Sequence, residues 1–177
     1  MPVITSPQIQ TMNVNIRLAT YADIPMILDI YNEAVLNTTA SYDYQPNTLE
    51  KRTAWYEDHL RKKLPVFVAE GATGRVVGWS ALSSFRHAEG YCFSAEDSVY
   101  VAADQRGKGI GKLLMPPLIE AAQGLGLHTI VAGIDAANTV SLRLHVAFGF
   151  EQVGYLKEVA YKFDRWLDLV LMQKVLK

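Results

Sequence analysis

A glycine-rich stretch in the middle of the chain has the residue types of an anion-binding turn. The stretch QRGKGIGK, residues 105–112, contains three glycines and three cationic side chains and follows the strand-like run SVYVAAD. A glycine-rich turn between a strand and a helix leaves backbone N–H groups free at the positive end of the helix dipole. Arg106, Lys108 and Lys112 add cationic donors at the same place. These residues predict a site for a pyrophosphate in preference to a single carboxylate.

Two familiar phosphate-binding motifs do not fit this turn. A P-loop needs four residues between its first glycine and its Gly-Lys pair, followed by a Ser or Thr that reaches Mg²⁺. Here only three residues separate Gly107 from Gly111, and Leu113 follows Lys112. A dinucleotide-binding fingerprint would need a third glycine where Lys112 stands. An anion site of a different type remains, with a solvated turn that binds nothing as the alternative.

Hydrophobic periodicity predicts which elements hold this turn in place. Apolar residues at helical or alternating spacing, bounded by glycine, proline and asparagine, divide nearly the whole chain. The order β-α-α-β-β-β-α-β-α-β-β predicts a single α/β domain with a mixed sheet. Strands are expected within 14–20, 65–85 (two strands joined by a turn at 71–74), 94–103, 128–135 and the last part of the chain, and helices within 20–37, 48–63, 109–125 and 138–150.

Two of the expected helices carry more specific predictions. In the helix at 109–125, Pro116 and Pro117 remove backbone donors and crowd the preceding turn, so we expect a kink there. In the helix at 48–63, the spacing predicts a buried side made of Leu49, Thr53, Tyr56 and Leu60.

The composition narrows the functional classes. The 177 residues carry 17 Lys and Arg against 18 Asp and Glu, so the chain lacks the net positive charge that nucleic-acid binding proteins direct at phosphates. Cys92 is the only cysteine, which excludes an internal disulfide and a cysteine metal cage and favours the cytoplasm. No apolar run is long enough to span a membrane. Residues 1–13 lack the features of a secretion signal, and we expect a poorly ordered extension there and a single domain at 14–177.

Two motifs carry a resemblance to a known family. The first is QRGKGIGKLL after EDSVYV. The second is NTVSLRLHVAFGF, in which the family's spacing is kept by Asn138, Ser141, His145, Gly149 and Phe150. Together they resemble the acetyl-CoA-dependent N-acetyltransferases of the GNAT superfamily, over almost the whole chain. The stretches SAEDSVYV, RLHVAFGF and AYKFDRWLDLVLMQ resemble the phosphinothricin acetyltransferase branch, which includes methionine sulfone and methionine sulfoximine acetyltransferases.

The resemblance implies the GNAT fold, a mixed central sheet of about seven strands flanked by about four helices, in agreement with the element order. It also implies acetyl-CoA as co-substrate and assigns the anion at the glycine turn to its pyrophosphate. The pantetheine arm would lie along the preceding strand as an added strand edge. The expected pyrophosphate donors are the backbone N–H groups of Arg106, Gly107, Lys108, Gly109, Ile110, Gly111 and Lys112. The other expected cofactor contacts are Val99 and Val101 on the strand and Asn138 and Ser141 on the short helix.

Glu96 and His145 are the catalytic residues that the resemblance implies. Glu96 would take the proton of the substrate amine, directly or through a water. Alternation along the strand places its side chain opposite that of Asp97, and an ordinary solvent-facing carboxylate is the alternative. His145 stands where this branch has a histidine, and it could protonate the departing sulfur or orient the substrate. A structural histidine on a half-buried helix is the alternative for His145.

An amino-acid substrate brings a carboxylate, and Arg86 in the loop FRHAEGYCF could bind it through a bidentate fork. Aromatic side chains could form the apolar wall of the same site; a solvated arginine and ordinary core aromatics are the alternatives. The expected wall residues are Tyr42, Phe85, Tyr91, Phe93 and Tyr161, with Lys162 and Trp166 as further candidates. No metal is expected, because His59, His87 and His128 lack the spacing of metal ligands.

These observations predict an N-acetyltransferase that moves acetyl from acetyl-CoA to the α-amine of a small amino-acid-like substrate, of the phosphinothricin, methionine sulfone or methionine sulfoximine type. We expect direct attack in a ternary complex, because Cys92, the only conceivable acyl carrier, precedes Glu96 and lies away from the glycine turn. Two alternatives remain open: an enzyme of the same fold that acetylates proteins, peptides or polyamines, and a non-catalytic acyl-CoA binding module. A homodimer is compatible with the resemblance, and no nucleic-acid or membrane partner is expected.

Overall fold

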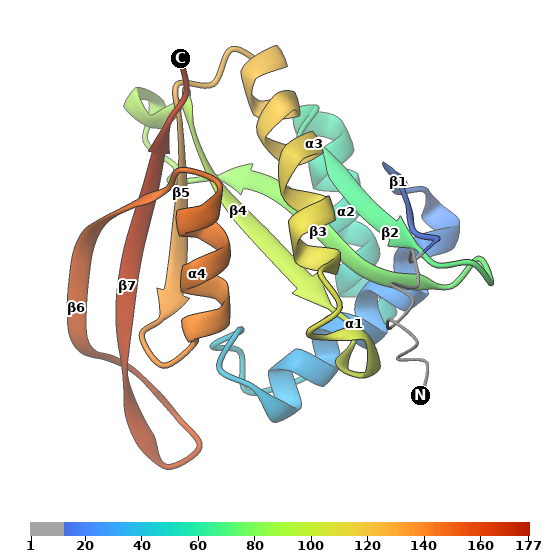
Figure 1. Ribbon diagram of the computed structural model, residues 1–177, viewed down its shortest axis with the longest axis horizontal. Coiled ribbons are helices and arrows are strands. Elements are labelled where there is room, and N and C mark those ends of the chain that lie inside the picture. Colours follow the sequence, from blue (N-terminus) through green and yellow to red (C-terminus); the bar gives the residue numbers. More distant parts are fainter. Residues whose placement is uncertain (1–12) are drawn as a thin grey trace, which may run out of the picture.

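The computed structural model describes residues 13–177, which form one seven-stranded mixed sheet with helices on both faces (Figure 1). All of the predicted extension except its last residue lies outside the described residues. The predicted order of helices and strands and the α/β class are confirmed. The strands are β1 (Asn15–Leu18), β2 (Val66–Glu70), β3 (Val76–Ser84), β4 (Ser94–Val101), β5 (Thr129–Asp135), β6 (Glu151–Lys162) and β7 (Arg165–Val175). The α-helices are α1 (Ile24–Asn37), α2 (Leu49–Lys62), α3 (Ile110–Gly124) and α4 (Thr139–Ala147), and short 3₁₀ helices lie at Tyr21–Asp23, Glu89–Tyr91 and Ala103–Gln105.

The pairing of β4 with β5 is the only parallel one in the described sheet, and it is short. The strand order is β1-β2-β3-β4-β5-β7-β6, and every other neighbouring pair is antiparallel. β4 and β5 pair only from Ser94 to Glu96 on β4, whereas β4 remains paired with β3 as far as Val101. Past Glu96 the two strands diverge (Figure 1). The edge of β4 from Asp97 to Val101 therefore has no strand partner on the side of β5.

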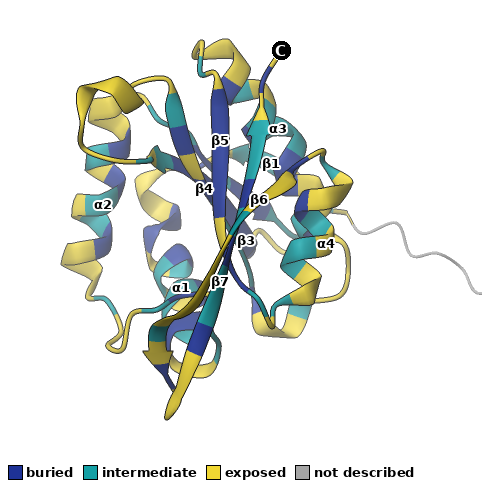
Figure 2. Cartoon of the chain, turned by 90° about the vertical axis from the view of Figure 1, so that its left-hand side faces the viewer, coloured by how far each residue is buried: buried dark blue, intermediate teal, exposed yellow. Residues whose placement is uncertain are grey.

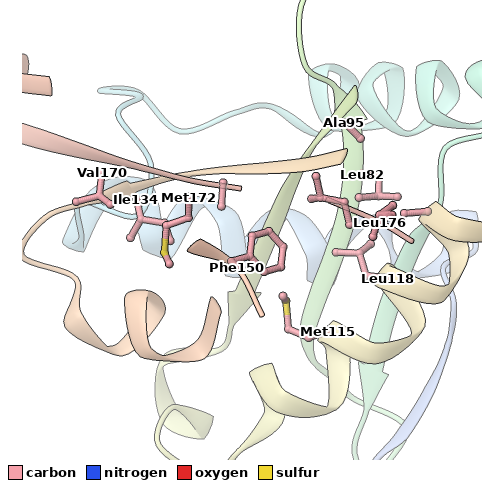
Figure 3. Close-up of a cluster of buried hydrophobic side chains, with 12 residues drawn as sticks. Leu82, Ala95, Met115, Leu118, Ile134, Phe150, Val170, Met172 and Leu176 are labelled. Carbon is pink, nitrogen blue, oxygen red and sulfur yellow. The ribbon is translucent and has the colours of Figure 1, made fainter. Parts of the chain in front are cut away.

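Each face of the sheet is covered by its own pair of helices, α1 and α2 on one face and α3 and α4 on the other (Figure 2). On the first face, Tyr56 of α2 packs in a buried cluster with Trp79 of β3. On the second face, Met115 and Leu118 of α3 pack against side chains of the strands, including Leu82 (Figure 3). Because neighbouring residues of a strand point to opposite faces, β3 supplies side chains to both clusters.

α3 continues as one helix across Pro116 and Pro117, so the kink predicted there does not divide it. The two prolines leave the carbonyl groups of Lys112 and Leu113 without their usual helical donors. Both of these residues are exposed, so water can hydrate their carbonyl groups. The prolines are therefore tolerated on the outer side of the helix.

The predicted buried side of α2 is wrong. Leu49 and Leu60 are 51% and 48% exposed, whereas Arg52, Tyr56 and His59 are buried. The prediction relied on the spacing of apolar residues, but two of the three buried side chains are polar. Only Tyr56 belongs to both the predicted and the observed side.

Tertiary contacts explain why polar side chains occupy the buried side of α2. The Arg52 guanidinium lies 3.9 Å from the centre of the Tyr31 ring and 4.7 Å from that of Trp55, so it is stabilised by aromatic faces. The two ring nitrogens of His59 lie 2.7 Å from the carbonyl oxygen of Trp55 and 3.2 Å from Oγ of Ser83. Tyr31 and Ser83 come from distant parts of the chain, so a periodicity argument cannot reveal them.

Candidate active site

Two glycines shape the turn between β4 and α3. Gly107 and Gly109 have φ angles of +77° and +84°, in the region that favours glycine. Among the described residues, no backbone N–H from Gly107 to Gly111 donates to another backbone carbonyl. α3 begins at Ile110, so these N–H groups lie at the positive end of its dipole. The geometry suits an anion such as a pyrophosphate.

The two ends of the predicted donor set are already hydrogen-bonded. The N–H of Arg106 lies 3.5 Å from the carbonyl oxygen of Ala103, and the N–H of Lys112 donates to the carbonyl of Gly109 at 3.0 Å. The free backbone donors are therefore those of 107–111, a narrower set than the sequence predicted.

The Arg106 side chain points to α1 and to the strand that precedes the turn. Its guanidinium forms an ion pair with Glu33 of α1, and its Nε donates to the carbonyl of Val101 at 3.2 Å. Val101 is one of the predicted cofactor contacts, and its carbonyl oxygen already accepts this hydrogen bond from Arg106. Val99, two residues earlier, is half-buried and pairs with Ser80 of β3, in the part of β4 that has no strand partner on the side of β5.

The N-terminus of α3 packs against the second half of α4. A Cβ on Gly111 would stand 3.2 Å from a methyl group of Leu144, so this glycine allows a close approach that the anion interpretation did not anticipate. Asn138 caps α4, because its Oδ1 accepts a hydrogen bond from the N–H of Ser141 at 3.1 Å. Asn138 and Ser141, which the sequence predicted as cofactor contacts, are both half-buried.

Glu96 stands at the point where β4 and β5 separate. It is the last residue of β4 paired with β5, opposite Val131, and its Oε1 lies 3.6 Å from the place of a Cβ on Gly133. The residue is exposed, yet the protein around its carboxylate removes part of its hydration. This desolvation, and then the charge of Asp97, raise the pKa of Glu96 above its ordinary value, while the charge of Arg86 lowers it. A carboxylate with a raised pKa at an accessible position has the properties of a general base.

His145 is buried between α4 and β4, and both of its ring nitrogens have partners. Nε2 lies 3.0 Å from Oδ2 of Asp97, and Nδ1 lies 2.8 Å from the carbonyl oxygen of Ser141. Burial lowers the pKa of His145, but the hydrogen bond and charge of Asp97 raise it by more, so the net shift is upward. In this arrangement His145 has no free nitrogen for a ligand, which favours the structural alternative over the expected contact with the sulfur or substrate.

The predicted acceptor residues fall into two groups, and no hydrogen bond, ion pair or aromatic pair joins the two groups among the described residues. Phe85 and Tyr91 of the β3–β4 loop pack edge to face at 5.5 Å, and the Arg86 guanidinium lies 5.0 Å from the centre of the Phe85 ring. Arg86 and Tyr91 also line a cavity of about 180 Å³. Phe93, at the end of this loop, is 63% exposed.

The second group lies around the loop that follows α1. The hydroxyl of Tyr42 is buried without a hydrogen-bond partner in the described chain, and burial, then the charges of Asp135 and Asp168, raise the pKa of Tyr42. Tyr161 and Trp166 of the β6–β7 hairpin pack edge to face at 5.1 Å and are exposed. Tyr42 is therefore the member of this group with an unsatisfied polar atom.

Lys162 has a role that the sequence did not reveal, although it was a further candidate. Its Nζ is buried and donates to the carbonyls of Thr38 at 2.9 Å and Ser41 at 2.5 Å. The hydroxyl of Tyr100 on β4 donates to the carbonyl of Ala40 at 2.9 Å. The loop after α1 is thus tied both to the β6–β7 hairpin and to the strand that carries Glu96.

Residues 13–177 contain neither a metal-binding cluster nor a membrane-spanning helix. No group of three His, Cys, Asp or Glu side chains is placed to hold a metal ion, and no helix has the length and apolar character needed to cross a membrane. Cys92 is exposed in the β3–β4 loop.

Comparisons with known proteins agree on one family. The family described as "Acetyltransferase (GNAT) domain" matches residues 16–171. The chain is 46% identical to the L-methionine sulfoximine/L-methionine sulfone acetyltransferase of Pseudomonas aeruginosa, over 92% of this chain and 94% of that protein.

Two solved structures have the same fold. A phosphinothricin acetyltransferase from Sinorhizobium meliloti in complex with acetyl-CoA has a TM-score of 0.91 and 37% identity, over 93% of this chain and 89% of that one. A protein from Brucella melitensis named ribosomal-protein-alanine N-acetyltransferase has a TM-score of 0.89 and 49% identity, over 92% of this chain and 99% of that one.

The geometry of the glycine turn predicts that Gly109→Ala weakens the binding of a pyrophosphate ligand. The substitution forces alanine into φ +84° and should move the free N–H groups. Gly126→Ala is the matched control, since Gly126 has φ +71° and equally open surroundings but lies past the far end of α3. With coenzyme A in isothermal titration calorimetry, we expect roughly a tenfold or larger rise in the dissociation constant for Gly109→Ala alone. Equal effects of the two substitutions would contradict the assignment of the turn.

Proposed function

The chain belongs to the GNAT acetyltransferase family, and from this premise we propose that it transfers acetyl from acetyl-CoA to the α-amine of a small amino-acid-like substrate. The observation that carries the proposal is the accessible carboxylate of Glu96 at the vertex of two diverging strands, beside a turn with free N–H groups. The methionine sulfone and sulfoximine activity in the name of the Pseudomonas relative supports this substrate class.

We propose that the cofactor lies along the divergence of β4 and β5. The N–H groups of 107–111 would bind its pyrophosphate, and the side chains of Arg106, Lys108 and Lys112 would add positive charge. The unpaired edge of β4 at Val99 would hold the pantetheine arm as an added strand edge, and Asn138 and Ser141 would contact it from α4. The complex of the Sinorhizobium enzyme with acetyl-CoA, on the same fold, supports this placement.

Glu96 is proposed as the general base. Most α-amines carry a proton at neutral pH and must lose it before the nitrogen lone pair can attack. Glu96 accepts that proton, directly or through a water, and its raised pKa brings its proton affinity closer to that of the amine. Acetyl-CoA supplies the activated acetyl thioester; as the new C–N bond forms, the C–S bond breaks and the thiolate leaves. Backbone N–H groups along the free edge of β4 are the available donors for the negative charge on the carbonyl oxygen.

Direct transfer without an acyl-enzyme follows from the position of Cys92. Cys92 is exposed in the β3–β4 loop, directly after the 3₁₀ helix Glu89–Tyr91. It therefore precedes β4 and does not lie on the diverging part of that strand. A covalent relay would need the thiol near the thioester. The amine therefore attacks the thioester in a ternary complex.

Arg86 is proposed to bind the carboxylate of the substrate. Arg86 lies in the β3–β4 loop, and its positive charge lowers the pKa of Glu96. It has no ion-pair partner within residues 13–177. Phe85, Tyr91 and Phe93 would form the wall on this side, and Tyr42 and Tyr161 the wall on the other. In this arrangement a substrate bound beside Glu96 would lie between the two groups.

One alternative keeps the chemistry and changes the acceptor. The Brucella protein's name refers to a ribosomal protein, so a protein or peptide N-terminus is a second candidate substrate for this chain. An N-terminal residue within a peptide offers an α-amine but no α-carboxylate. Whether the rate of acetylation depends on a carboxylate in the acceptor therefore distinguishes the two candidate substrates.

We further propose that residues 14–177 act as one domain and that two copies associate through the β6–β7 hairpin. β6 is an edge strand of the sheet, and it runs into a hairpin that extends beyond the body of the protein (Figure 1). An unpaired edge with exposed apolar side chains is suited to self-association. The exposed apolar residues of the hairpin are Val153, Tyr155, Leu156, Val159, Tyr161, Phe163 and Trp166.

Removal of the base should abolish most of the acetylation without loss of binding. For Glu96→Gln we expect kcat to fall by about 10²- to 10⁴-fold, the usual contribution of a general base. Thiol release from acetyl-CoA measures turnover, and calorimetry checks that coenzyme A still binds. Cys92→Ala is the companion variant and should retain nearly full activity, whereas its inactivity would establish a covalent relay. An unchanged kcat in Glu96→Gln would remove Glu96 from the mechanism, and a parent protein without any thiol release would favour a binding module.

The acceptor is tested with methionine sulfone, methionine sulfoximine, phosphinothricin, spermidine and a peptide with a free N-terminus. We expect turnover with the three amino-acid analogues and roughly a tenfold or larger loss in kcat/KM for the same amine without its carboxylate. Arg86→Gln should cause a similar loss and make the enzyme indifferent to that carboxylate. Arg61→Gln, which changes an exposed arginine of α2, is the control. Turnover confined to the peptide would replace the proposed substrate.

Association through the hairpin predicts a sedimentation mass of twice that of the chain. Val159→Lys places a charge on the exposed apolar surface of β6 and should yield monomers, because burying that charge at an interface is costly. Leu36→Lys, at a similarly exposed apolar residue of α1, should leave the mass unchanged. A monomeric parent protein at micromolar concentration would refute the dimer.

A further inference from the structure

We propose that Asp97 and His145 form a positioning unit that holds Glu96, their neighbour on β4, and controls the electric field at its carboxylate. His145 then acts through Asp97 and does not touch substrate or cofactor. The proposal rests on the proposed function, in which Glu96 is the base. It differs from the role that the sequence suggested for His145, proton donation to the departing sulfur.

The hydrogen bonds of the pair define where its protons lie. The carbonyl oxygen of Ser141 can only accept, so Nδ1 of His145, 2.8 Å away, must carry a hydrogen. A second proton is then shared between Nε2 and Oδ2 of Asp97, which are 3.0 Å apart. The side chains of His145 and Asp97 are only 5% and 1% exposed, so water does not screen this ion pair.

Asp97 depends on His145 as its one side-chain partner in the described part of the chain. It is the first residue of β4 beyond the pairing with β5, and on its other edge it pairs with Leu82 of β3. Its second carboxylate oxygen, Oδ1, is buried without a partner among the described residues. His145 therefore ties the beginning of the diverging part of β4 to α4, the helix capped by Asn138.

The pair lies next to the base in the chain but on the other face of the sheet. The negative charge of Asp97 raises the pKa of Glu96, and a proton on His145 offsets that charge. Arg86, from the β3–β4 loop, acts on Glu96 in the opposite direction, and Tyr100 of β4 lies on the same face as Glu96. Among residues 13–177, Asp97 is the charged side chain that shifts the pKa of His145. The other contacts of the His145 ring include the Ser141 carbonyl, the Ser141 hydroxyl at 3.4 Å from Nδ1, and the Phe150 ring, which is nearly perpendicular to it.

Two substitutions should move the acid limb of the pH profile of kcat/KM in opposite directions. Asp97→Asn removes the negative charge beside Glu96, so the base stays ionised to lower pH and the limb shifts downward. His145→Gln leaves the charge of Asp97 without its cation, so Glu96 becomes protonated at higher pH and the limb shifts upward. A shift of about half a pH unit changes activity on the limb about threefold relative to each variant's own plateau. Normalisation to the plateau separates this shift from a general loss of activity.

Controls distinguish this proposal from a structural role and from failure of the proposed function. His128→Gln replaces another histidine, an exposed one just before β5 whose recorded hydrogen bonds are made by its backbone, and should leave the limb where it is. Asp97→Asn combined with His145→Gln removes both charges and should resemble Asp97→Asn. Glu96→Gln should abolish the limb; if the limb persists, the base is wrong and the proposed function fails with it. If Glu96→Gln abolishes the limb but neither pair variant moves it, or both move it the same way, only the positioning role is overturned. Urea unfolding at each pH confirms that every variant assayed is folded.

Discussion

The early end of the parallel pairing between β4 and β5 is the constraint on which the site depends. β4 stays paired with β3 as far as Val101, and β5 stays paired with β7 over its full length, Thr129–Asp135. Each diverging strand is therefore stabilised on its outer edge, so the inner edges can stay open at little cost to the sheet. The opening begins at Glu96, where the small Gly133 of β5 leaves room for the carboxylate. The strand pairing thus places the proposed base and the unpaired edge of β4 together.

Features that depend on neighbours in the chain could be predicted, and those that depend on distant partners could not. The order of elements, the turn at Gly107 and Gly109 and the opposite orientation of Glu96 and Asp97 all follow from local spacing, and the structure agrees with them. The prediction of the buried side of α2 was wrong because Arg52 and His59 have partners in α1 and β3. The partner of His145 was missed for the same reason, since Asp97 lies forty-eight residues earlier. The roles of the site residues themselves remain predictions.

The acceptor side of the sheet shows what a turn-like sequence can conceal. The segment after α1 has the composition of a simple turn, but it is held by side chains from β4 and from the β6–β7 hairpin. Lys162 is buried with two carbonyl acceptors and no carboxylate within hydrogen-bond distance among the described residues, and burial lowers its pKa. A buried cation of this kind costs free energy unless its hydrogen bonds are made, so its cost is offset only while the loop keeps its place. The position of Tyr42 in this loop consequently depends on a residue more than a hundred positions away.

Two neighbouring carboxylates of β4 illustrate how one strand can serve both faces of a sheet. Glu96 and Asp97 are adjacent carboxylates, and the charge of Asp97 raises the pKa of Glu96. Alternation sends Glu96 to the accessible α1/α2 face and Asp97 into the layer beneath α4, where a histidine can compensate one of them and not the other. In the proposed mechanism, the uncompensated carboxylate of Glu96 is the base, and the compensated carboxylate of Asp97 belongs to the framework. Since both properties come from a single dipeptide at the point where the strands part, the chemistry and the packing of this site cannot be altered independently.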